Sequence, residues 1–346
     1  MKEFKKLPKL KKCDKVAILS PSFAAPAVWP QVYELGLERI KNVFGLVPVE
    51  YPVTRKLGAS GEERAKDLIA AFSDPDIKAV ISTLGGDDQV TYIKNLPIEP
   101  FFNNPKPFFG YSDNTHFQNF LWLSGIPSFY GGALFTQFAM QGEMDEFTKK
   151  YLDKALFTDE TVELTASNEF NDEGLSWNDL ENLTKRRKYE PNSGWFWDGE
   201  VNTQGVLWGG CLESVDELFR NNIQIPHLED FKNIVLILET SEEIPSKNYV
   251  HRVIRAFGER GLLQEVQGVL VGRPKTWEFG NEKETLEKEV YKKEQREVFL
   301  NTIRKYNKDC PVIQNLDFGH TDPQICMPLG CEIIINCNDK SLTTSF

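Results

Sequence analysis

No stretch of this 346-residue sequence is apolar over the length of a membrane-spanning helix, which is about 20 residues. The N-terminus is rich in lysine, and no apolar run like that of a secretory signal peptide comes before Val16. We therefore expect a cytoplasmic protein that has no membrane partner.

The sequence also lacks closely spaced cysteine pairs and has fewer basic than acidic residues. The 6 cysteines form no Cys-x-x-Cys pair and have no histidine at metal-ligand spacing, which predicts reduced thiols and no metal site. Lysine and arginine number 40 against 51 aspartates and glutamates, a formal net charge of −11. A protein that binds a nucleic-acid backbone needs a basic face, so this balance disfavours a nucleic-acid polymer as partner.

The fingerprint Gly-x-Gly-x-x-Gly and the lysine of a Walker phosphate loop are both missing. Their absence disfavours a nucleotide-dependent transferase or dehydrogenase, and we expect no cofactor. The glycine pair in Gly85-Gly86-Asp87-Asp88 fits either a bare turn or backbone amides that face a phosphate or an oxyanion.

The first 156 residues alternate between short apolar runs and helical patterns. Such strands, separated by helices, are typical of βαβ units, which build a mostly parallel sheet with its ligand site beyond the carboxyl ends of the strands. Ser60 and Glu63 form a capping-box signature at one helix start. Buried strands are predicted over 15–20, 77–83 and 106–111, and helices over 29–44 and 60–72.

The segment 157–204 interrupts this rhythm, because it is polar and charged and contains Trp177, Trp195 and Trp197. We interpret it as a linker followed by a long loop. From residue 205 the alternation returns. We therefore predict an α/β protein, with an N-terminal mostly parallel α/β sandwich domain over 1–156 and a smaller C-terminal α/β domain over 205–346.

Ser112 stands between a predicted strand and a helical pattern, in Gly110-Tyr111-Ser112-Asp113-Asn114. A serine at such a turn is held out of the sheet, beside backbone amides that can stabilise an oxyanion. The glycine usual two positions later is replaced by Asn114. Ser, Asp and Asn before a helix also form an ordinary N-cap cluster, so both interpretations stand.

A nucleophilic serine needs a general base, usually histidine near neutral pH. Of the 4 histidines, His320 is placed best, because it follows a predicted strand over 312–318 and comes directly after Gly319. A carboxylate must then hold the ring. Glu239 ends the aliphatic run 234–238, where an unpaired carboxylate would be poorly solvated. A solvated loop histidine and a solvent-facing carboxylate are the plain alternatives.

Short motifs spread over nearly the whole chain carry a resemblance. They are VAILSPS from Val16, STLGGDD from Ser82, PKPFFGYSDNT from Pro105, SFYGG from Ser128, LWGGCLE from Leu207, LILET from Leu236, FGHT from Phe318 and PLG from Pro328. In this order they resemble a family of serine peptidases that includes the LD-carboxypeptidases and the microcin C immunity proteins.

The resemblance implies a Ser-Glu-His triad of Ser112, Glu239 and His320, with the serine on the N-terminal domain and the other two residues on the C-terminal domain. It also implies an oxyanion hole formed by the amides of Gly86 and Asp113, a site at the domain interface, and a homodimer. No metal takes part in such chemistry.

The family has two activities. Immunity-type members cleave the amide of peptidyl- or aminoacyl-nucleotide conjugates, whereas LD-carboxypeptidases trim a D-amino acid from muropeptides. The Gly-Gly-Asp-Asp motif and the long loop resemble the first group, in which a loop aromatic stacks on the nucleobase. A muramoyl-tetrapeptide carboxypeptidase and, less well supported, a non-catalytic ligand-binding α/β protein are the alternatives. The implied substrate contacts are Gly85, Asp87, Trp195, Trp197 and, toward phosphate, Arg186, with Arg187 as the alternative arginine. The same tryptophans also fit simple packing of the loop.

Overall fold

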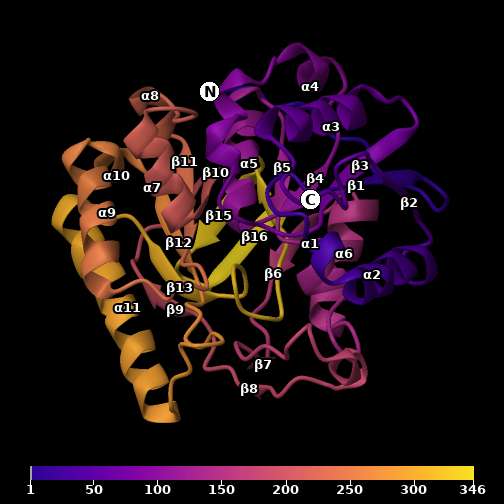
Figure 1. The fold of residues 1–346 in the computed structure, drawn as a ribbon. Helices are drawn as coiled ribbons and strands as arrows, with labels where there is room; N and C mark the ends of the chain where they lie inside the picture. Colours follow the sequence, from indigo (N-terminus) through magenta and orange to yellow (C-terminus); the bar gives the residue numbers. More distant parts are fainter. Residues whose placement is uncertain (1) are drawn as a thin grey trace.

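In the computed structural model, which describes residues 2–346, the predicted strands of the N-terminal part gather into one sheet of 6 strands (Figure 1). Five of them are parallel, and the sixth, contributed by the C-terminal part of the chain, runs antiparallel at one edge. The order across the sheet is β14 (Met327–Leu329), β5 (Ser128–Tyr130), β4 (Phe108–Gly110), β3 (Ile77–Ser82), β1 (Lys15–Leu19) and β2 (Val47–Glu50).

The strand order reverses between β1 and β3, which places a crevice beyond the carboxyl ends of these strands. Helices cover both faces of the sheet (Figure 1). The predicted capping box forms at Ser60, whose side chain accepts from the Glu63 amide. One face carries α3 (Gly61–Ser73), α4 (Glu99–Asn103) and α5 (Thr115–Leu123); the other carries α1 (Ala25–Val28), α2 (Pro30–Asn42) and α6 (Glu146–Phe157). Short turns of helix are η1 (Gln89–Thr91), η2 (Ile93–Asn95), η4 (Leu134–Phe138) and η5 (Leu180–Thr184).

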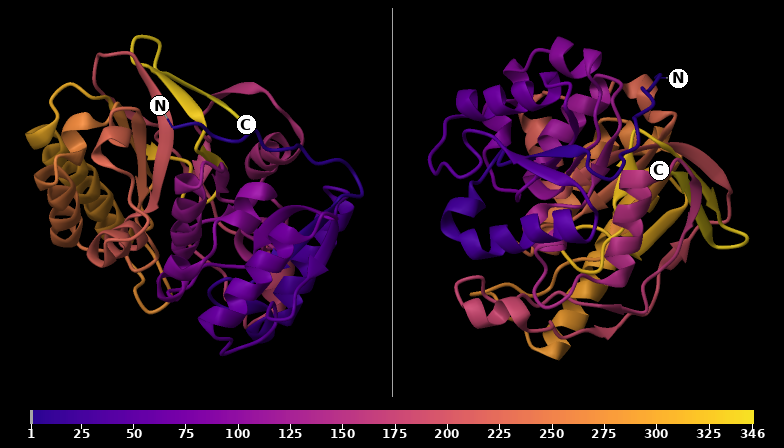
Figure 2. Two further views of the ribbon diagram at one scale, coloured as in Figure 1. Left: turned by 90° about the horizontal axis from the view of Figure 1, so that it is seen from above. Right: turned by 90° about the vertical axis from the view of Figure 1, so that its right-hand side faces the viewer.

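A second sheet of 8 strands forms the C-terminal half. Its four central parallel strands follow one another in sequence, and their crossover helices lie together on the outer face, away from the first domain (Figure 2). Its order is β6 (Thr161–Leu164), β16 (Ser341–Ser345), β15 (Glu332–Asn336), β10 (Thr203–Cys211), β11 (Ile234–Glu239), β12 (Gly268–Gly272), β13 (Val312–Leu316) and β9 (Phe196–Asp198). The helices are α7 (Leu212–Asn221), α8 (Leu228–Phe231), α9 (Lys247–Glu259), α10 (Leu262–Glu265) and α11 (Thr285–Tyr306).

Both faces of the second sheet are buried at its central strands β11 and β12, which explains the uninterrupted aliphatic run of β11. Ile234, Leu236 and Leu238 belong to the core beneath the outer helices, whereas Val235 and Ile237 belong to the core that continues into the first domain. Side chains alternate along a strand. Glu239 therefore follows Val235 and Ile237 onto the face that meets the first domain.

The two domains meet where α5 packs on β10. Glycine permits the approach, because a Cβ at Gly210 would stand 2.6 Å from the Thr115 Oγ1 and 3.1 Å from the Tyr130 ring. The Thr115 hydroxyl accepts from the amide of Cys211 at 3.0 Å, and the Trp122 indole donates to the carbonyl of Leu207 at 3.1 Å. Direct hydrogen bonds thus fix the carboxyl end of β10 beside the start of α5.

The segment 157–204 contains more regular structure than a linker and a loop. Its β6 and β9 are the two edge strands of the second sheet, and β7 (Glu169–Phe170) pairs with β8 (Glu190–Pro191). Short edge strands carry weak periodicity, which is why the sequence pattern did not indicate them. The prediction of an α/β fold with a mostly parallel N-terminal sheet is confirmed.

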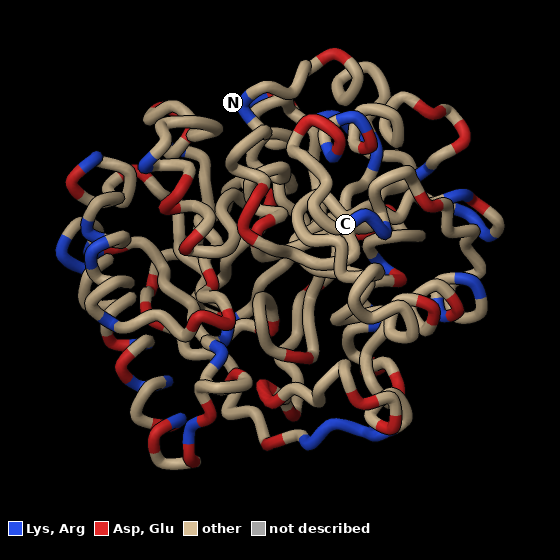
Figure 3. Tube along the Cα trace, in the orientation of Figure 1, with Lys and Arg blue, Asp and Glu red and all other residues tan. Residues whose placement is uncertain are grey.

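The structure also places the cysteines and the charged residues. All 6 cysteines are free thiols. Acidic and basic residues are interspersed over the molecule in Figure 3, and the longest basic run, at its lower edge, is the segment 185–188. Among residues 2–346, no helix has the length and apolar character to cross a membrane.

We predict that Gly209→Ala destabilises the protein by about 2–4 kcal/mol, because the new Cβ would enter a tight backbone contact at a strained φ. It would stand 2.0 Å from the carbonyl oxygen of Ile237, and φ is +134°. Gly280→Ala is the control, since φ is +80° there but no atom lies within 4 Å of the new Cβ; it should cost about 1 kcal/mol. Urea unfolding measures both, and equal losses would contradict the packing argument.

Candidate active site

Ser112 adopts a left-handed backbone conformation at the turn between β4 and η3 (Ser112–Asn114), with φ +63°. This conformation costs a non-glycine residue about 1–2 kcal/mol, so the surroundings must hold it. Gly85 supplies the space, because a Cβ there would stand 2.9 Å from the Ser112 Oγ and 3.4 Å from the Asp113 amide nitrogen. The glycine loop, the serine hydroxyl and that amide therefore border one small space.

The Asp113 carboxylate anchors the glycine loop rather than capping a helix. Its Oδ2 accepts from the amides of Asp88 and Gln89, both at 3.1 Å, and from the Ser22 hydroxyl. Its Oδ1 lies 2.8 Å from His116 Nδ1. Burial works to raise the pKa of this carboxyl, but His116 and the hydrogen bonds outweigh it and lower the pKa. Asp113 thus fixes the loop that carries Gly86 against the start of α5.

Glu239 and His320 form a hydrogen-bonded pair at the carboxyl ends of β11 and β13. His320 Nδ1 lies 2.8 Å from Glu239 Oε2, and the Glu239 side chain is fully buried. Gly319 and Gly272 line the carboxylate, since a Cβ at Gly319 would stand 2.5 Å from Oε2 and one at Gly272 would stand 2.7 Å from the Glu239 Cβ. The structure therefore brings together the two C-terminal residues proposed from the sequence.

Tyr130 connects this pair to Ser112 across the domain boundary. Its hydroxyl donates to Glu239 Oε1 at 2.5 Å and accepts from the Ser112 amide at 3.3 Å. Burial and the charge of Glu239 raise the pKa of Tyr130 well above its ordinary value, so the hydroxyl keeps its proton and remains a donor. The sequence analysis quoted Tyr130 within SFYGG but gave it no role, because only the fold places β5 opposite β11.

His320 is held by two carboxylates. Its Nε2 lies 2.9 Å from Glu242 Oε2, and no hydrogen bond between residues 2–346 joins Ser112 to His320. Burial works to lower the pKa of His320, but Glu239 and Glu242 outweigh it and raise the pKa to about 10. Partial desolvation of the half-exposed Glu242 side chain works to raise its pKa, but the His320 charge outweighs this effect and lowers the pKa to about 2. The ring is therefore an imidazolium near neutral pH.

A cavity of about 710 Å³ opens over these residues at the junction of the two domains. Ser112, Gly85 and Gly86 line it from the first domain, and His320 and Glu242 line it from the second. Aromatic residues form one wall, where the Trp29 and Trp177 ring centroids lie 5.0 Å apart and Trp177 lies 5.4 Å from Phe135. The cavity thus combines a reactive end with an aromatic wall.

Of the tryptophans in the long segment, the structure places Trp177 at this cavity, and Trp195 and Trp197 are not among the residues that line it. Trp195 donates its indole N–H to Asp317 Oδ2 at 3.0 Å, and Trp197 lies in β9, paired with β13. Both pack against the core. The resemblance implied that both contact the substrate, but Trp197 in β9 and Trp195 just before it lie at the edge of the second sheet.

The two other polar contacts expected from the sequence also lie outside the cavity lining. Arg186 is exposed and lies 3.4 Å from Glu169, and Asp87 is exposed beside the glycine loop. Arg187 lines the cavity instead, paired with Asp322 at 2.6 Å. Arg187 is held there by Asp322, which lies 135 positions away in the sequence, so local sequence does not reveal which of the two neighbouring arginines faces inward.

Within residues 2–346, two groups of residues have the atoms to hold a metal ion. They are Asp113 with His116 and Glu217, and Asp172 with Glu173 and Glu190. In the first, His116 Nε2 lies 3.3 Å from Glu217 Oε2 and Nδ1 lies against Asp113, so the imidazole serves both carboxylates. In the second, the buried Lys288 ammonium lies among all three carboxylates. Ion pairs within the protein account for both groups.

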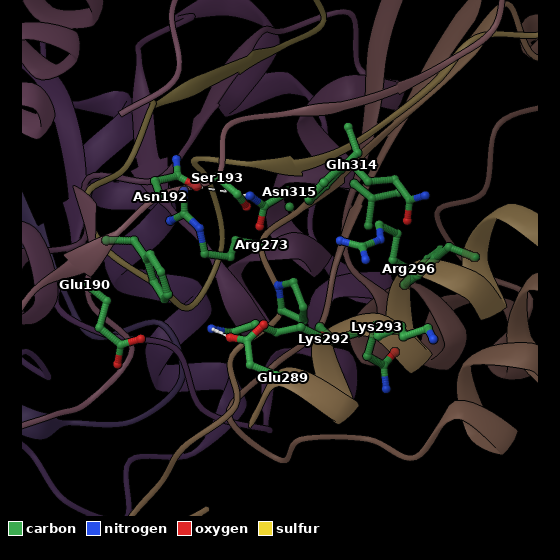
Figure 4. A pocket seen from close by; sticks show the side chains of 18 of the residues that line it. Glu190, Asn192, Ser193, Arg273, Glu289, Lys292, Lys293, Arg296, Gln314 and Asn315 are labelled. Atoms are coloured by element: carbon green, nitrogen blue, oxygen red, sulfur yellow. Dashed lines mark hydrogen bonds and ion pairs between the residues drawn. The ribbon is translucent and has the colours of Figure 1, made fainter. Parts of the chain in front are cut away.

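A second cavity of about 490 Å³ lies between β8, β13 and α11, and it contains neither Ser112 nor His320. In Figure 4, Lys292, Lys293 and Arg296 extend from α11 on one side, while Asn192 and Asn315 lie across the cavity. Asn315 Nδ2 donates to Asn192 Oδ1 at 3.1 Å. This cavity has polar walls but no nucleophile paired with a base, so the junction cavity is the candidate active site.

A serine and a carboxylate-bound histidine that face one cavity from two α/β domains are characteristic of hydrolases of the serine peptidase class. Two family models match the chain, the LD-carboxypeptidase N-terminal domain over residues 16–131 and the LD-carboxypeptidase C-terminal domain over residues 204–335. The chain belongs to this family of peptidases, and the resemblance drawn from the sequence motifs is confirmed.

Relatives carry names from both branches of the family. The microcin C7 self-immunity protein MccF of Escherichia coli is 24% identical over 285 residues, which cover 82% of this chain and 78% of MccF. YocD of Bacillus subtilis, whose name assigns it to the carboxypeptidases, is 27% identical over 325 residues, with 93% of each chain covered.

Solved structures share the fold. A MccF-like protein from Streptococcus pneumoniae in complex with AMP superposes with a TM-score of 0.84 at 24% identity, over 96% of this chain and 98% of that one. MccF in complex with aspartyl sulfamoyl adenosine gives a TM-score of 0.85 at 22% identity, over 98% of both chains. The two-domain arrangement of this protein is therefore that of the MccF fold.

We predict that the protein loses stability as the pH rises from 6.5 toward 10. The pKa of His116 is raised to about 9 and that of His320 to about 10, both from 6.5. A raised folded-state pKa gives a contribution that is complete below the unfolded value and disappears as the pH passes the folded value. Urea unfolding from pH 6.5 to 9.5 should show this loss, with a smaller loss between pH 6.5 and 9 in His116→Gln. A variant as pH-sensitive as the wild type would contradict the assignment to His116.

Proposed function

We propose that this protein is a serine peptidase or amidase that hydrolyses the amide bond of peptidyl- or aminoacyl-nucleotide conjugates. The observation that carries the proposal is the junction cavity, in which Ser112 and His320 lie at one end and the Trp29–Trp177 wall forms a side. A cavity of about 710 Å³ matches the volume range of small-molecule sites. No cofactor is invoked, and the homodimer implied by the family resemblance stays a prediction.

In the proposed mechanism, Ser112 Oγ attacks the carbonyl carbon of the scissile amide, and the neutral form of His320 accepts the hydroxyl proton at Nε2. Glu239 holds Nδ1 and stabilises the imidazolium that forms. The protonated ring then gives its proton to the departing nitrogen. Water next attacks the acyl-enzyme with the same base, which releases the acid and restores Ser112.

The amides of Gly86 and Asp113 are the proposed oxyanion donors. The Asp113 amide lies at the start of the helical turn that continues into α5, where backbone N–H groups lack intrahelical acceptors. Hydrogen bonds from the Asp113 carboxylate to the loop keep the Gly86 segment close to Ser112. Such preorganised donors stabilise charge that develops during acyl transfer.

The aromatic wall supports a nucleobase or another flat group as part of the substrate. Trp177 is the member of the long segment that reaches the cavity, and Trp29 beside it is oriented by a 2.8 Å hydrogen bond from its indole to Asn178. Lys275 and Arg187 also line the cavity and provide positive charge for a phosphate-like linker. MccF, which binds aspartyl sulfamoyl adenosine, shares this fold.

Trimming of a D-amino acid from a muramoyl tetrapeptide is the second candidate. It is favoured by the carboxypeptidase names of several relatives. Lys275 or Arg187 would then receive the free carboxylate of the substrate, and Trp177 would have only a packing role.

Ser112→Ala should lower hydrolysis by roughly 10³-fold or more, because the acyl acceptor is removed. Wild type and variant are incubated with an aminoacyl-sulfamoyl-adenosine conjugate and with a muramoyl tetrapeptide, and mass spectrometry follows the products. Cleavage of the conjugate alone, lost in the variant, supports the proposal. Trimming of the tetrapeptide alone supports the second candidate. Full activity in the variant would overturn the mechanism.

Trp177→Ala should raise the KM for the nucleoside conjugate by roughly 10-fold or more, since stacking contributes about 1–3 kcal/mol per base. Trp177→Phe should retain most of the affinity because it keeps an aromatic face. Trp197→Phe is the matched control, since Trp197 is not among the residues that line the cavity. Steady-state kinetics on folded variants measure all three. An equal KM in wild type and Trp177→Ala would remove Trp177 from the binding site.

A further inference from the structure

The Glu242 carboxylate is paired with the histidine nitrogen that must accept a proton in the proposed mechanism. His320 Nδ1 lies on Glu239, so Nε2 is the nitrogen left to take the Ser112 proton, and it lies 2.9 Å from Glu242 Oε2. In this state the ring is doubly paired and carries both of its protons, so it cannot accept another. Catalysis therefore requires the contact between Glu242 and His320 to open.

Glu242 differs from the other carboxylates that line the cavity. Each of those has a lysine or arginine partner: Asp322 pairs with Arg187, Glu278 with Lys275, and Asp172 and Glu173 with Lys288. The single ion pair of Glu242 among residues 2–346 is with His320. Glu242 is thus the cavity carboxylate that a cationic ligand can engage without breaking a lysine or arginine pair.

The backbone around Glu242 is fixed, whereas its side chain is free to turn. Glu213 accepts from the amide and the hydroxyl of Ser241 at 3.1 and 2.8 Å, and the carbonyl of Pro245 accepts from Tyr291 and Gln295 at 2.9 and 2.8 Å. The Glu242 side chain remains 51% exposed. A rotation of this side chain alone is therefore enough to release His320.

We infer that Glu242 is a latch on His320 and that the α-ammonium group of the substrate opens it, so that the enzyme selects conjugates whose acyl amino acid has a free α-amino group. This inference rests on the proposed function and restricts its substrates to aminoacyl conjugates, because the α-nitrogen of a peptidyl conjugate is acylated and carries no charge. In an aminoacyl conjugate the ammonium is attached to the carbon next to the scissile carbonyl. Ser112, His320 and Glu242 line the same cavity, so with that carbonyl at Ser112 the ammonium lies in the cavity with Glu242 and can replace His320 as its partner.

The exchange of partners converts the imidazolium into a base. When Glu242 pairs with the ammonium, His320 keeps one carboxylate partner, and its Nε2 proton passes to water. The neutral ring then accepts the Ser112 proton. The charged and titratable groups around the ring are Glu239 and Glu242, with Tyr111 at 4.9 Å between ring centroids, and Lys275 acts on Glu242 through its charge.

Glu242 also separates the two candidate substrates. In a muramoyl tetrapeptide the α-nitrogen next to the scissile carbonyl is part of a peptide bond and carries no charge. Such a substrate leaves the latch closed. The latch thereby favours aminoacyl conjugates over muropeptides within the same catalytic machinery.

The test compares an alanyl-sulfamoyl-adenosine conjugate with its N-acetyl counterpart. Wild type should prefer the free amine by roughly 10- to 100-fold in kcat/KM, the effect of a charge-assisted hydrogen bond. In Glu242→Gln the preference should fall below roughly 3-fold, while turnover of the N-acetyl conjugate rises. Glu243→Gln, which removes the same charge at the neighbouring exposed position, should keep the wild-type preference. An unchanged preference in Glu242→Gln would overturn the inference.

Nuclear magnetic resonance of histidine-labelled full-length protein separates this inference from the proposed function. The pKa of His320 should fall in Glu242→Gln and stay unchanged in Glu243→Gln. In Ser112→Ala protein, the free-amine conjugate should shift the His320 resonance toward the neutral form, and the N-acetyl conjugate should not. If no variant hydrolyses either conjugate, the proposed function fails. The latch is then overturned by an unchanged His320 pKa in Glu242→Gln and supported by a lowered one.

Discussion

The buried carboxylate of Glu239 is the group on which the candidate site depends. It accepts from His320 at 2.8 Å and from Tyr130 at 2.5 Å, and Tyr130 in turn accepts from the Ser112 amide. One ionised group thus links a strand of the first domain to two strand ends of the second. A buried charge without partners in this position would destabilise the folded protein. The hydrogen bonds from His320 and Tyr130 therefore stabilise the contact between the two domains.

The glycines around the site permit the close approaches that this arrangement requires. Gly210 allows α5 and Tyr130 to approach β10, Gly319 and Gly272 leave room for the Glu239 carboxylate, and Gly85 leaves room for Ser112. Ser112 itself stays in a left-handed conformation that the turn would not adopt alone. The site is consequently assembled from close backbone approaches, and a single added methyl group would disturb most of them.

Much of the fold and part of the candidate site could be predicted from the sequence. Hydrophobic patterns indicated the central strands and the long helices, and Ser60 with Glu63 indicated a helix start. Glu239 after an aliphatic run and His320 after a strand were reasoned to need each other, and the structure places them in contact. Trp195 and Trp197 were named as substrate contacts through the family resemblance, yet Trp177 is the tryptophan of the segment 157–204 that lines the cavity.

The sequence by itself determined which side chains of a strand share a face, where helices begin, and which strand ends carry reactive side chains. These features depend on local periodicity and turn chemistry. Tertiary structure decided which strand ends meet. It brings the Tyr130 hydroxyl to Glu239 and the Glu242 carboxylate to Nε2 of His320. It also places Trp177 and Arg187 in the cavity wall. The contact of Tyr130 with Glu239 joins residues 109 positions apart and that of Glu242 with His320 joins residues 78 positions apart, so local periodicity and turn chemistry cannot reveal them.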